Sequence, residues 1–176
     1  ATVDRNEDLR LWDARSGKLL RSARGIHDAS LTAVAFSPDG SLLVTASKDQ
    51  TLKIFGGEDL EELFTLEGHR NSVQCITFSP DGTRLASGGD LGEVYLWSVD
   101  EGALLISLEG VQGTVLDLEF SPNGERLVAC GRDFGLAVWE SAGKQERYAN
   151  LQEERHIERG ARRVLDGLFA SLCAPD

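Results

Sequence analysis

The chain has 176 residues, of which 41% are hydrophobic, and it contains no apolar run long enough to cross a bilayer. Its formal net charge of −11 creates a field that repels phosphate, so nucleic acids and anionic membranes are disfavoured as partners. The three cysteines, Cys75, Cys130 and Cys173, are odd in number and lack the spacing of metal ligands. We expect them to be buried, reduced thiols in a cytoplasmic protein.

One unit of about 42 residues recurs through the first 149 residues. The stretch Phe36–Gly40 reads FSPDG, and it returns as FSPDG at Phe78–Gly82 and as FSPNG at Phe120–Gly124. An aromatic residue keeps the same register, at Trp12, Phe55, Trp97 and Trp139. Within each unit, short runs of alternating apolar residues are separated by Pro-Asp-Gly and Asp/Gly turns, which is typical of antiparallel strands joined by hairpins. Four strands per unit of this length predict a β-propeller blade.

The repeat divides the chain into one partial blade, three full blades and a tail. Residues 1–26 form a partial blade, because Ala1–Val3 aligns with Val44–Ala46 inside a second strand. Three full blades follow at about 31–67, 73–109 and 115–149. In the tail, 150–176, apolar residues at three- and four-residue steps predict an amphipathic helix. These tail residues are Ile157, Ala161, Val164, Leu165, Leu168, Phe169 and Leu172. We expect the helix to pack on the propeller, or else to dock a partner or a second copy.

Several short motifs resemble those of WD-repeat β-propellers over about residues 1–148: Gly68-His69, the repeated FSPDG, and Leu11-Trp12-Asp13. The resemblance implies an all-β fold, an incomplete WD-repeat β-propeller of about three full four-stranded blades plus a partial N-terminal blade, with a C-terminal amphipathic helix. Closed propellers have four to eight blades, so this arc does not close a ring. We expect either the C-terminal part of a longer protein whose upstream blades are missing, which the mid-strand start favours, or a ring closed by homodimerisation.

The resemblance also implies a hydrogen-bonded group within each blade, made of a His, a Ser or Thr, an Asp and a Trp. Counting from the repeat markers places its surviving members at His27, Ser47, Asp49, His69, Trp97, Asp133 and Trp139. The missing members are replaced by Phe55 in the first full blade, Gly89 and Leu91 in the second, and Val111 and Gly131 in the third. No blade keeps all four, so we expect apolar packing to dominate, with the Phe36 ring directed into it.

No pattern in the sequence indicates catalysis, and we expect a non-enzyme without cofactor or metal. The Gly-rich run Gly88–Gly92 lies in a turn between strands, with no following helix to bind phosphate. No serine lies in a nucleophile elbow. His27 and His69 occupy equivalent points of successive blades, which is a poor arrangement for one metal. A hydrolase or lyase in the propeller channel stays open as a minor alternative, and it requires acidic or histidine side chains that converge there.

Function is expected in the loops, which a rigid scaffold presents to partners. In the resembled family one loop face commonly binds peptides or proteins. The matching contact positions here are Asp28, Lys48, Arg70, Asn71, Asp90, Gln112 and Arg132. We therefore expect a non-catalytic protein-interaction scaffold, the regulatory C-terminal end of a larger multidomain protein, with self-assembly by homodimerisation as the alternative. The stretch ARRVLDGLFASL is similar to helical tails of bacterial multidomain proteins, which implies a bacterial signalling protein.

Overall fold

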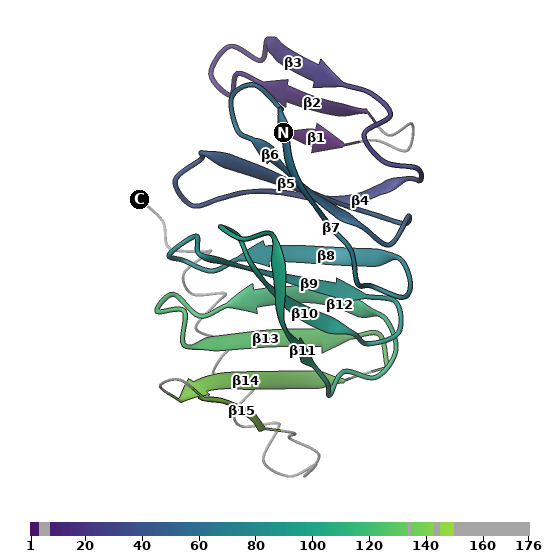
Figure 1. Cartoon of the computed structure of the whole chain (residues 1–176), viewed down its shortest axis with the longest axis vertical. Helices are drawn as coiled ribbons and strands as arrows, with labels where there is room; N and C mark the ends of the chain where they lie inside the picture. Colours follow the sequence, from purple (N-terminus) through teal and green to yellow (C-terminus); the bar gives the residue numbers. More distant parts are fainter. Residues whose placement is uncertain (4–7, 134, 143–144, 150–176) are drawn as a thin grey trace.

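The computed structural model describes residues 1–3, 8–133, 135–142 and 145–149. Its strands form four antiparallel sheets that succeed one another along the long axis of the molecule (Figure 1). The predicted all-β fold, an incomplete propeller with one partial blade, is therefore confirmed. The helix predicted over 150–176 lies outside the described residues. Within the described ranges, no helix is long and apolar enough to span a membrane.

Within each sheet, every strand pairs with the next strand along the chain, so each sheet is a simple meander. The first sheet consists of β1 (Thr2–Val3), β2 (Leu9–Trp12) and β3 (Leu19–Ala23). The second consists of β4 (Leu31–Phe36), β5 (Leu42–Ser47), β6 (Leu52–Gly56) and β7 (Glu62–Leu66). The third consists of β8 (Val73–Phe78), β9 (Arg84–Gly89), β10 (Val94–Ser98) and β11 (Ala103–Leu108). The fourth consists of β12 (Val115–Phe120), β13 (Arg126–Gly131), β14 (Leu136–Ala142) and β15 (Gln145–Ala149).

The core lies between the sheets. The first strands of the full sheets contact one another, β4 with β8 and β8 with β12. The second strands are buried on both faces, because a neighbouring sheet covers each side: Leu43–Ser47 of β5 and Leu85–Gly89 of β9 are buried throughout. Separate apolar clusters fill the three interfaces, and the cluster beside the first sheet is the smallest, with only Leu9, Leu43 and Phe55 fully inside it. Burial of these apolar surfaces is the main force holding the sheets together.

The repeated FSPDG stretch forms the same turn in each full sheet. In the first, Gly40 N–H donates to Ser37 O at 2.9 Å, and Ser37 Oγ donates to Asp39 Oδ1 at 2.6 Å. The glycine has a positive φ in all three copies: 76° at Gly40, 73° at Gly82 and 70° at Gly124. An L-residue with a side chain is strained at such angles, so glycine is the residue that closes this turn without cost.

The expectation that the Phe36 ring lies inside the packing is wrong. Phe36 is 40% exposed, whereas its counterparts Phe78 and Phe120 are 9% and 6% exposed. Leu42 belongs to the cluster around Phe78, and the Arg84 guanidinium lies 5.6 Å from the centre of the Phe120 ring. Counting back one repeat from Leu42 and Arg84, the position equivalent to them beside Phe36 lies ahead of Ala1.

Candidate functional site

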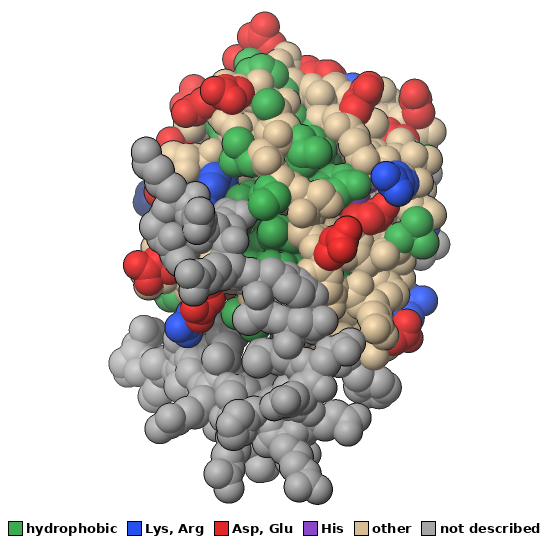
Figure 2. All heavy atoms as spheres, turned by 60° about the horizontal axis from the view of Figure 1, so that its bottom comes forward, with side chains coloured by type: hydrophobic (Ala, Val, Ile, Leu, Met, Phe, Trp, Pro, Cys, Tyr) green, Lys and Arg blue, Asp and Glu red, His purple; other side chains and the backbone are tan. Residues whose placement is uncertain are grey.

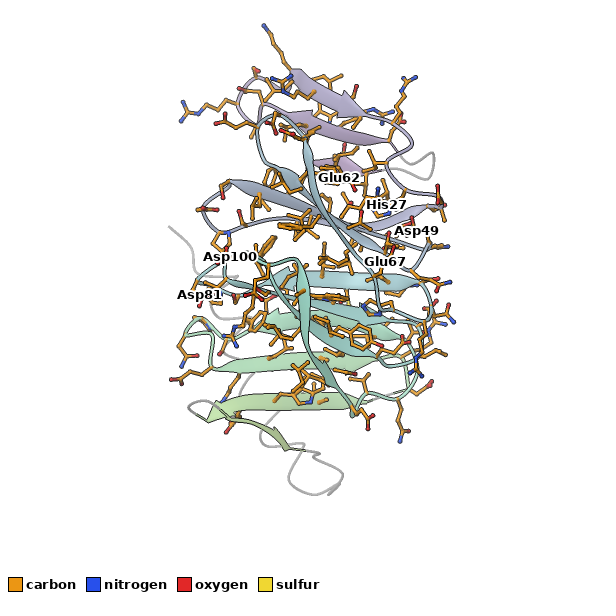
Figure 3. The ribbon with its side chains drawn as sticks, in the orientation of Figure 1. His27, Asp49, Glu62, Glu67, Asp81 and Asp100 are labelled. Atoms are coloured by element: carbon orange, nitrogen blue, oxygen red, sulfur yellow. The ribbon has the colours of Figure 1, made fainter. Side chains whose placement is uncertain are left out.

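The predicted contact residues lie along one edge of the stacked sheets. The loop before each first strand and the turn before each third strand end at this edge, near His27 and Asp49 in Figure 3, whereas Asp81 and Asp100 mark the opposite edge. Five of the contact residues are exposed, and together they come from all three full sheets: Asp28, Lys48, Arg70, Gln112 and Arg132. Asn71 and Asp90 are half-buried. The chain therefore gathers most of these side chains on one surface.

Hydrogen bonds hold this edge in one conformation. The same backbone bond recurs in each full sheet, from the turn before the third strand to the loop before the first: Lys48 N to Ser30 O at 3.0 Å, Asp90 N to Ser72 O at 3.1 Å, and Arg132 N to Thr114 O at 2.9 Å. Gln74 Nε2 also donates to Asp90 Oδ1 at 2.9 Å. Loops tied in this way lose little conformational entropy when a partner binds.

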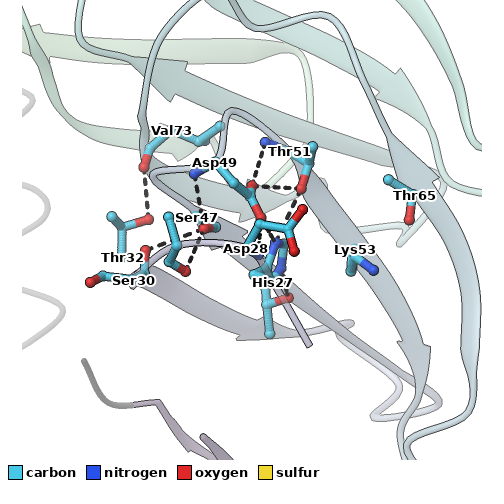
Figure 4. A network of polar contacts seen from close by, with 12 residues as sticks. His27, Asp28, Ser30, Thr32, Ser47, Asp49, Thr51, Lys53, Thr65 and Val73 are labelled. Atoms are coloured by element: carbon cyan, nitrogen blue, oxygen red, sulfur yellow. Dashed lines mark hydrogen bonds and ion pairs between the residues drawn. The ribbon is translucent and has the colours of Figure 1, made fainter. Parts of the chain in front are cut away.

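A polar network in the second sheet joins His27 to the turn after β5 (Figure 4). His27 Nδ1 lies 2.8 Å from Asp49 Oδ2, and His27 Nε2 lies 2.8 Å from Thr45 Oγ1. Asp49 also accepts from Thr51 Oγ1 at 2.7 Å, from Thr51 N at 2.9 Å and from Asp28 N at 2.9 Å. Ser47 lies beside this network and ties the loop before β4 to the turn after β5. Its Oγ donates to Ala29 O at 2.9 Å and accepts from Asp49 N at 3.1 Å.

The His27 imidazole is neutral near neutral pH, because its pKa lies below the usual value. Burial lowers the pKa of His27, although the hydrogen bond and charge of Asp49 act in the opposite direction. Burial alone would raise the pKa of Asp49, but the hydrogen bonds from Thr51, Asp28 and His27 outweigh it and lower that pKa. A neutral His27 with its proton on Nδ1 donates to Asp49 and accepts from Thr45.

In the third sheet, the hydroxyl group that bonds to the histidine belongs to Ser87, and not to the residue at position 89. Ser87 Oγ lies 2.7 Å from His69 Nε2 and accepts the Trp97 indole N–H at 2.8 Å. The prediction that Gly89 occupies the serine position, leaving this blade without a hydroxyl, is therefore wrong. The same correction applies in the second sheet, where Thr45 rather than Ser47 bonds to His27.

The residue that carries this hydroxyl has a constant spacing from the blade aromatic. It lies ten residues before the blade aromatic, at Thr2, Thr45 and Ser87, and Trp12 Nε1 donates to Thr2 Oγ1 at 2.8 Å. In the fourth sheet this position is Ala129, and the Trp139 indole donates instead to Glu109 O at 3.3 Å. Asp133 is exposed there, with Val111 in the place of the histidine. The prediction that Gly131 stands at the serine position of the fourth sheet is therefore also wrong, because the equivalent of Ser87 is Ala129.

The two cysteines that the structure describes lie in different environments. Cys75 is buried, and burial raises the pKa of its thiol to about 12. Cys130 is exposed, so the expectation of a buried thiol is wrong for it, and Cys173 lies outside the described residues. In the described part of the chain, no group of three or more His, Cys, Asp or Glu is arranged to hold a metal ion.

Comparisons with known proteins agree with this architecture. The family model described as WD domain, G-beta repeat matches residues 17–56, 60–98 and 102–140. Eukaryotic translation initiation factor 3 subunit I of Drosophila ananassae is 37% identical over 65 residues, which are 37% of this chain and 20% of that protein. Dynein assembly factor with WD repeat domains 1 of Danio rerio is 48% identical over 61 residues, which are 35% of this chain and 14% of that protein.

A solved structure, that of U3-55K, superimposes with a TM-score of 0.74 at 23% identity, covering 83% of this chain and 46% of that one. The likeness concerns the fold alone, and the chain spans less than half the length of each of these proteins. The two relatives named are from animals, so they give no support to a bacterial signalling context, which stays a prediction. Three repeat matches cover most of the described sheets. The chain belongs to the WD-repeat family.

Proposed function

We propose that this chain is a non-catalytic scaffold that binds a protein partner through the edge carrying Asp28, Lys48, Arg70, Asn71, Asp90, Gln112 and Arg132. The observation that carries the proposal is the backbone bond repeated in every full sheet, which fixes Lys48, Asp90 and Arg132 at the same level of the stack. WD-repeat proteins generally act as interaction scaffolds, and the relatives are by name a factor subunit and an assembly factor. Nucleic acids and membranes are not proposed as partners, because the chain is strongly acidic, and acidic side chains outnumber basic ones on the described part of the face in Figure 2.

Site-specific photo-crosslinking tests the proposed edge. A benzophenone amino acid is placed singly at positions 48, 90 and 132, and at the matched controls 101 and 125, which lie in turns at the opposite edge. Adducts to another protein are expected at the first three positions and not at the controls, since a preorganised face contacts its partner through those loops. Equal adduct yields at both edges would contradict the proposal.

The open arc favours a second function, self-assembly. Among the described residues, Trp12 of the first sheet is 39% exposed and Phe36 of the second is 40% exposed, so both present aromatic surface. We propose that either upstream blades of a larger cytoplasmic protein, of which this chain is the regulatory C-terminal end, or a second copy covers this surface. The molar mass of the full chain in solution, compared with that of residues 1–149, separates the two. A dimer lost on truncation supports self-assembly, whereas a monomer at all concentrations contradicts it.

A further inference from the structure

Glu93, just before β10, has a buried carboxylate without a partner. Both its oxygens are buried and neither has a hydrogen-bond donor. The nearest ionisable nitrogen is His69 Nδ1, which lies 3.9 Å from Glu93 Oε2, too far for a hydrogen bond, and which is itself without a partner. An unsatisfied buried carboxylate is costly, so it needs an explanation.

The second sheet shows how this scaffold satisfies a carboxylate at the same level. Asp49 receives hydrogen bonds from the His27 ring, the Thr51 side chain and two backbone N–H groups. In the third sheet Leu91 stands at the position of Asp49, and Glu93 stands at the position of Thr51. The carboxylate of the third sheet thus comes from a residue two positions later in the repeat and from a longer side chain than Asp49. None of the donors that bond to Asp49 has a counterpart that bonds to Glu93.

Among the residues that the structure describes, no cation supplies the missing charge. Burial lowers the pKa of His69 to about 4, so its ring is neutral at pH 7. The Trp97 indole donates to Ser87 Oγ, and His69 Nε2 lies 2.7 Å from the same oxygen, so in either tautomer the neutral His69 ring brings no positive charge to Glu93. Arg70 is exposed and lies at the same cavity, but it makes no hydrogen bond to Glu93.

Glu93 lines an open surface cavity of about 290 Å³ at the predicted binding edge, far larger than the roughly 10–15 Å³ of such volume that one water needs. Its wall combines apolar and acidic groups: Leu91, Tyr95, Leu108 and Glu109. Leu91 is 62% exposed at the rim, where it offers apolar surface to a ligand. A hydrocarbon stem that ends in a positive head matches this wall, because the stem packs on apolar groups while the head meets a carboxylate.

We propose that this cavity binds a lysine or arginine side chain of a protein partner, with Glu93 as its counter-ion. The proposal rests on the proposed scaffold function, and it names the chemistry of the group that the partner inserts. A small rotation of the Glu93 side chain brings its carboxylate to the inserted head. Leu91 then covers the stem, and Glu109 adds a second negative charge at the mouth.

Peptide binding to the full chain tests the site. The probes are acetyl-Gly-Arg-Gly-amide, the lysine analogue, and the neutral citrulline analogue, which has nearly the same shape as arginine. Binding is followed by NMR through the amides of Gly89 and Gly92 and the indole N–H of Trp97. We expect saturable shifts with the arginine and lysine peptides and at least tenfold weaker binding of the citrulline peptide. Glu93→Gln should weaken the charged peptides at least tenfold, while Glu101→Gln, at the opposite edge, should leave them unchanged.

A second readout needs no variant. The ¹³C signal of the Glu93 side-chain carboxyl should move with the arginine peptide and stay in place with citrulline. Equal binding of both peptides, or full binding by a folded Glu93→Gln variant, overturns the proposal. A shift of the Glu93 signal in the free Arg70→Ala variant also overturns it, because Arg70 would then be the occupant. If the peptides fail while cross-links persist at positions 48, 90 and 132, the cation site is wrong and the scaffold function stands.

Discussion

Ser87 and Trp97 are joined by a buried hydrogen bond, in which the indole N–H donates to the serine Oγ over 2.8 Å. Trp97 is 1% exposed and Ser87 is fully buried. His69 Nε2 shares the same hydroxyl at 2.7 Å. One small side chain thus satisfies two buried rings, which links the loop before β8 to the second and third strands of its sheet.

Replacing Ser87 by alanine should lower the free energy of unfolding by about 2–3 kcal/mol, because the Trp97 N–H and the His69 Nε2 lose their partner in a dry environment. The measurement is urea unfolding followed by tryptophan fluorescence. Ser22→Ala, at an exposed position of β3, is the matched control and should change stability by no more than about 0.5 kcal/mol. Equal effects of the two substitutions would show that the shared hydroxyl does not stabilise the blade.

The repeated phenylalanines should differ in what they contribute. Phe78→Ala should cost about 3 kcal/mol or more, as expected for a buried aromatic ring. Phe36→Ala, at the same repeat position but 40% exposed, should cost about 1.5 kcal/mol or less. Urea unfolding of the full chain compares the two directly. A cost for Phe36 as large as that for Phe78 would mean that the Phe36 ring is covered in solution.

Stability should fall as the solution is acidified from about pH 6.5 towards pH 4, by up to about 3 kcal/mol from His69 alone. Burial lowers the pKa of His69 from 6.5 to about 4, so the unfolded chain takes up its proton first as the pH falls. The lowered pKa of His27 acts in the same direction. The lowered pKa of Asp49 adds a loss at more acidic pH, since that stability is present above the unfolded pKa and disappears as the pH passes below the folded one.

Urea unfolding at half-unit pH steps measures this dependence. The slope of stability against pH, rather than stability itself, is compared between the parent chain and His69→Gln, since glutamine does not titrate. A shallower slope is expected for the variant between pH 6.5 and 5. Identical slopes would contradict a buried neutral His69.

The two described cysteines should react with a thiol reagent at different rates. Cys75 is buried, and burial raises the pKa of its thiol to about 12, so little thiolate forms at neutral pH. Cys130 is exposed. In a Cys173→Ser background, maleimide labelling followed by peptide mass analysis should modify Cys130 at least tenfold faster than Cys75. Comparable rates in the folded protein, with fast labelling of both in urea as the reference, would contradict the burial of Cys75.

Several features of the site were out of reach of the sequence for a physical reason. Ser47 and Thr45 lie two residues apart on β5, so their side chains point to the same face and a repeat alignment does not distinguish their partners. In the third sheet Trp97 pairs with Leu85, and its indole reaches diagonally to Ser87. The orphaned carboxylate of Glu93 also escaped prediction, because its position in the repeat is held by Thr51 in one blade and by Gly135 in another.

The sequence by itself determined the number, order and turns of the blades, because alternating apolar runs and Ser-Pro-Asp-Gly turns act over a few neighbouring residues. Positive φ angles at Gly40, Gly82 and Gly124 bear out that local chemistry. Only the tertiary structure decided that Ser87 bonds to His69, that Phe36 is exposed while Phe78 is buried, and that the buried Glu93 carboxylate receives no hydrogen bond from the described residues. Each of these depends on what a neighbouring strand or sheet places against the residue, and such contacts between distant parts of the chain have no local signature.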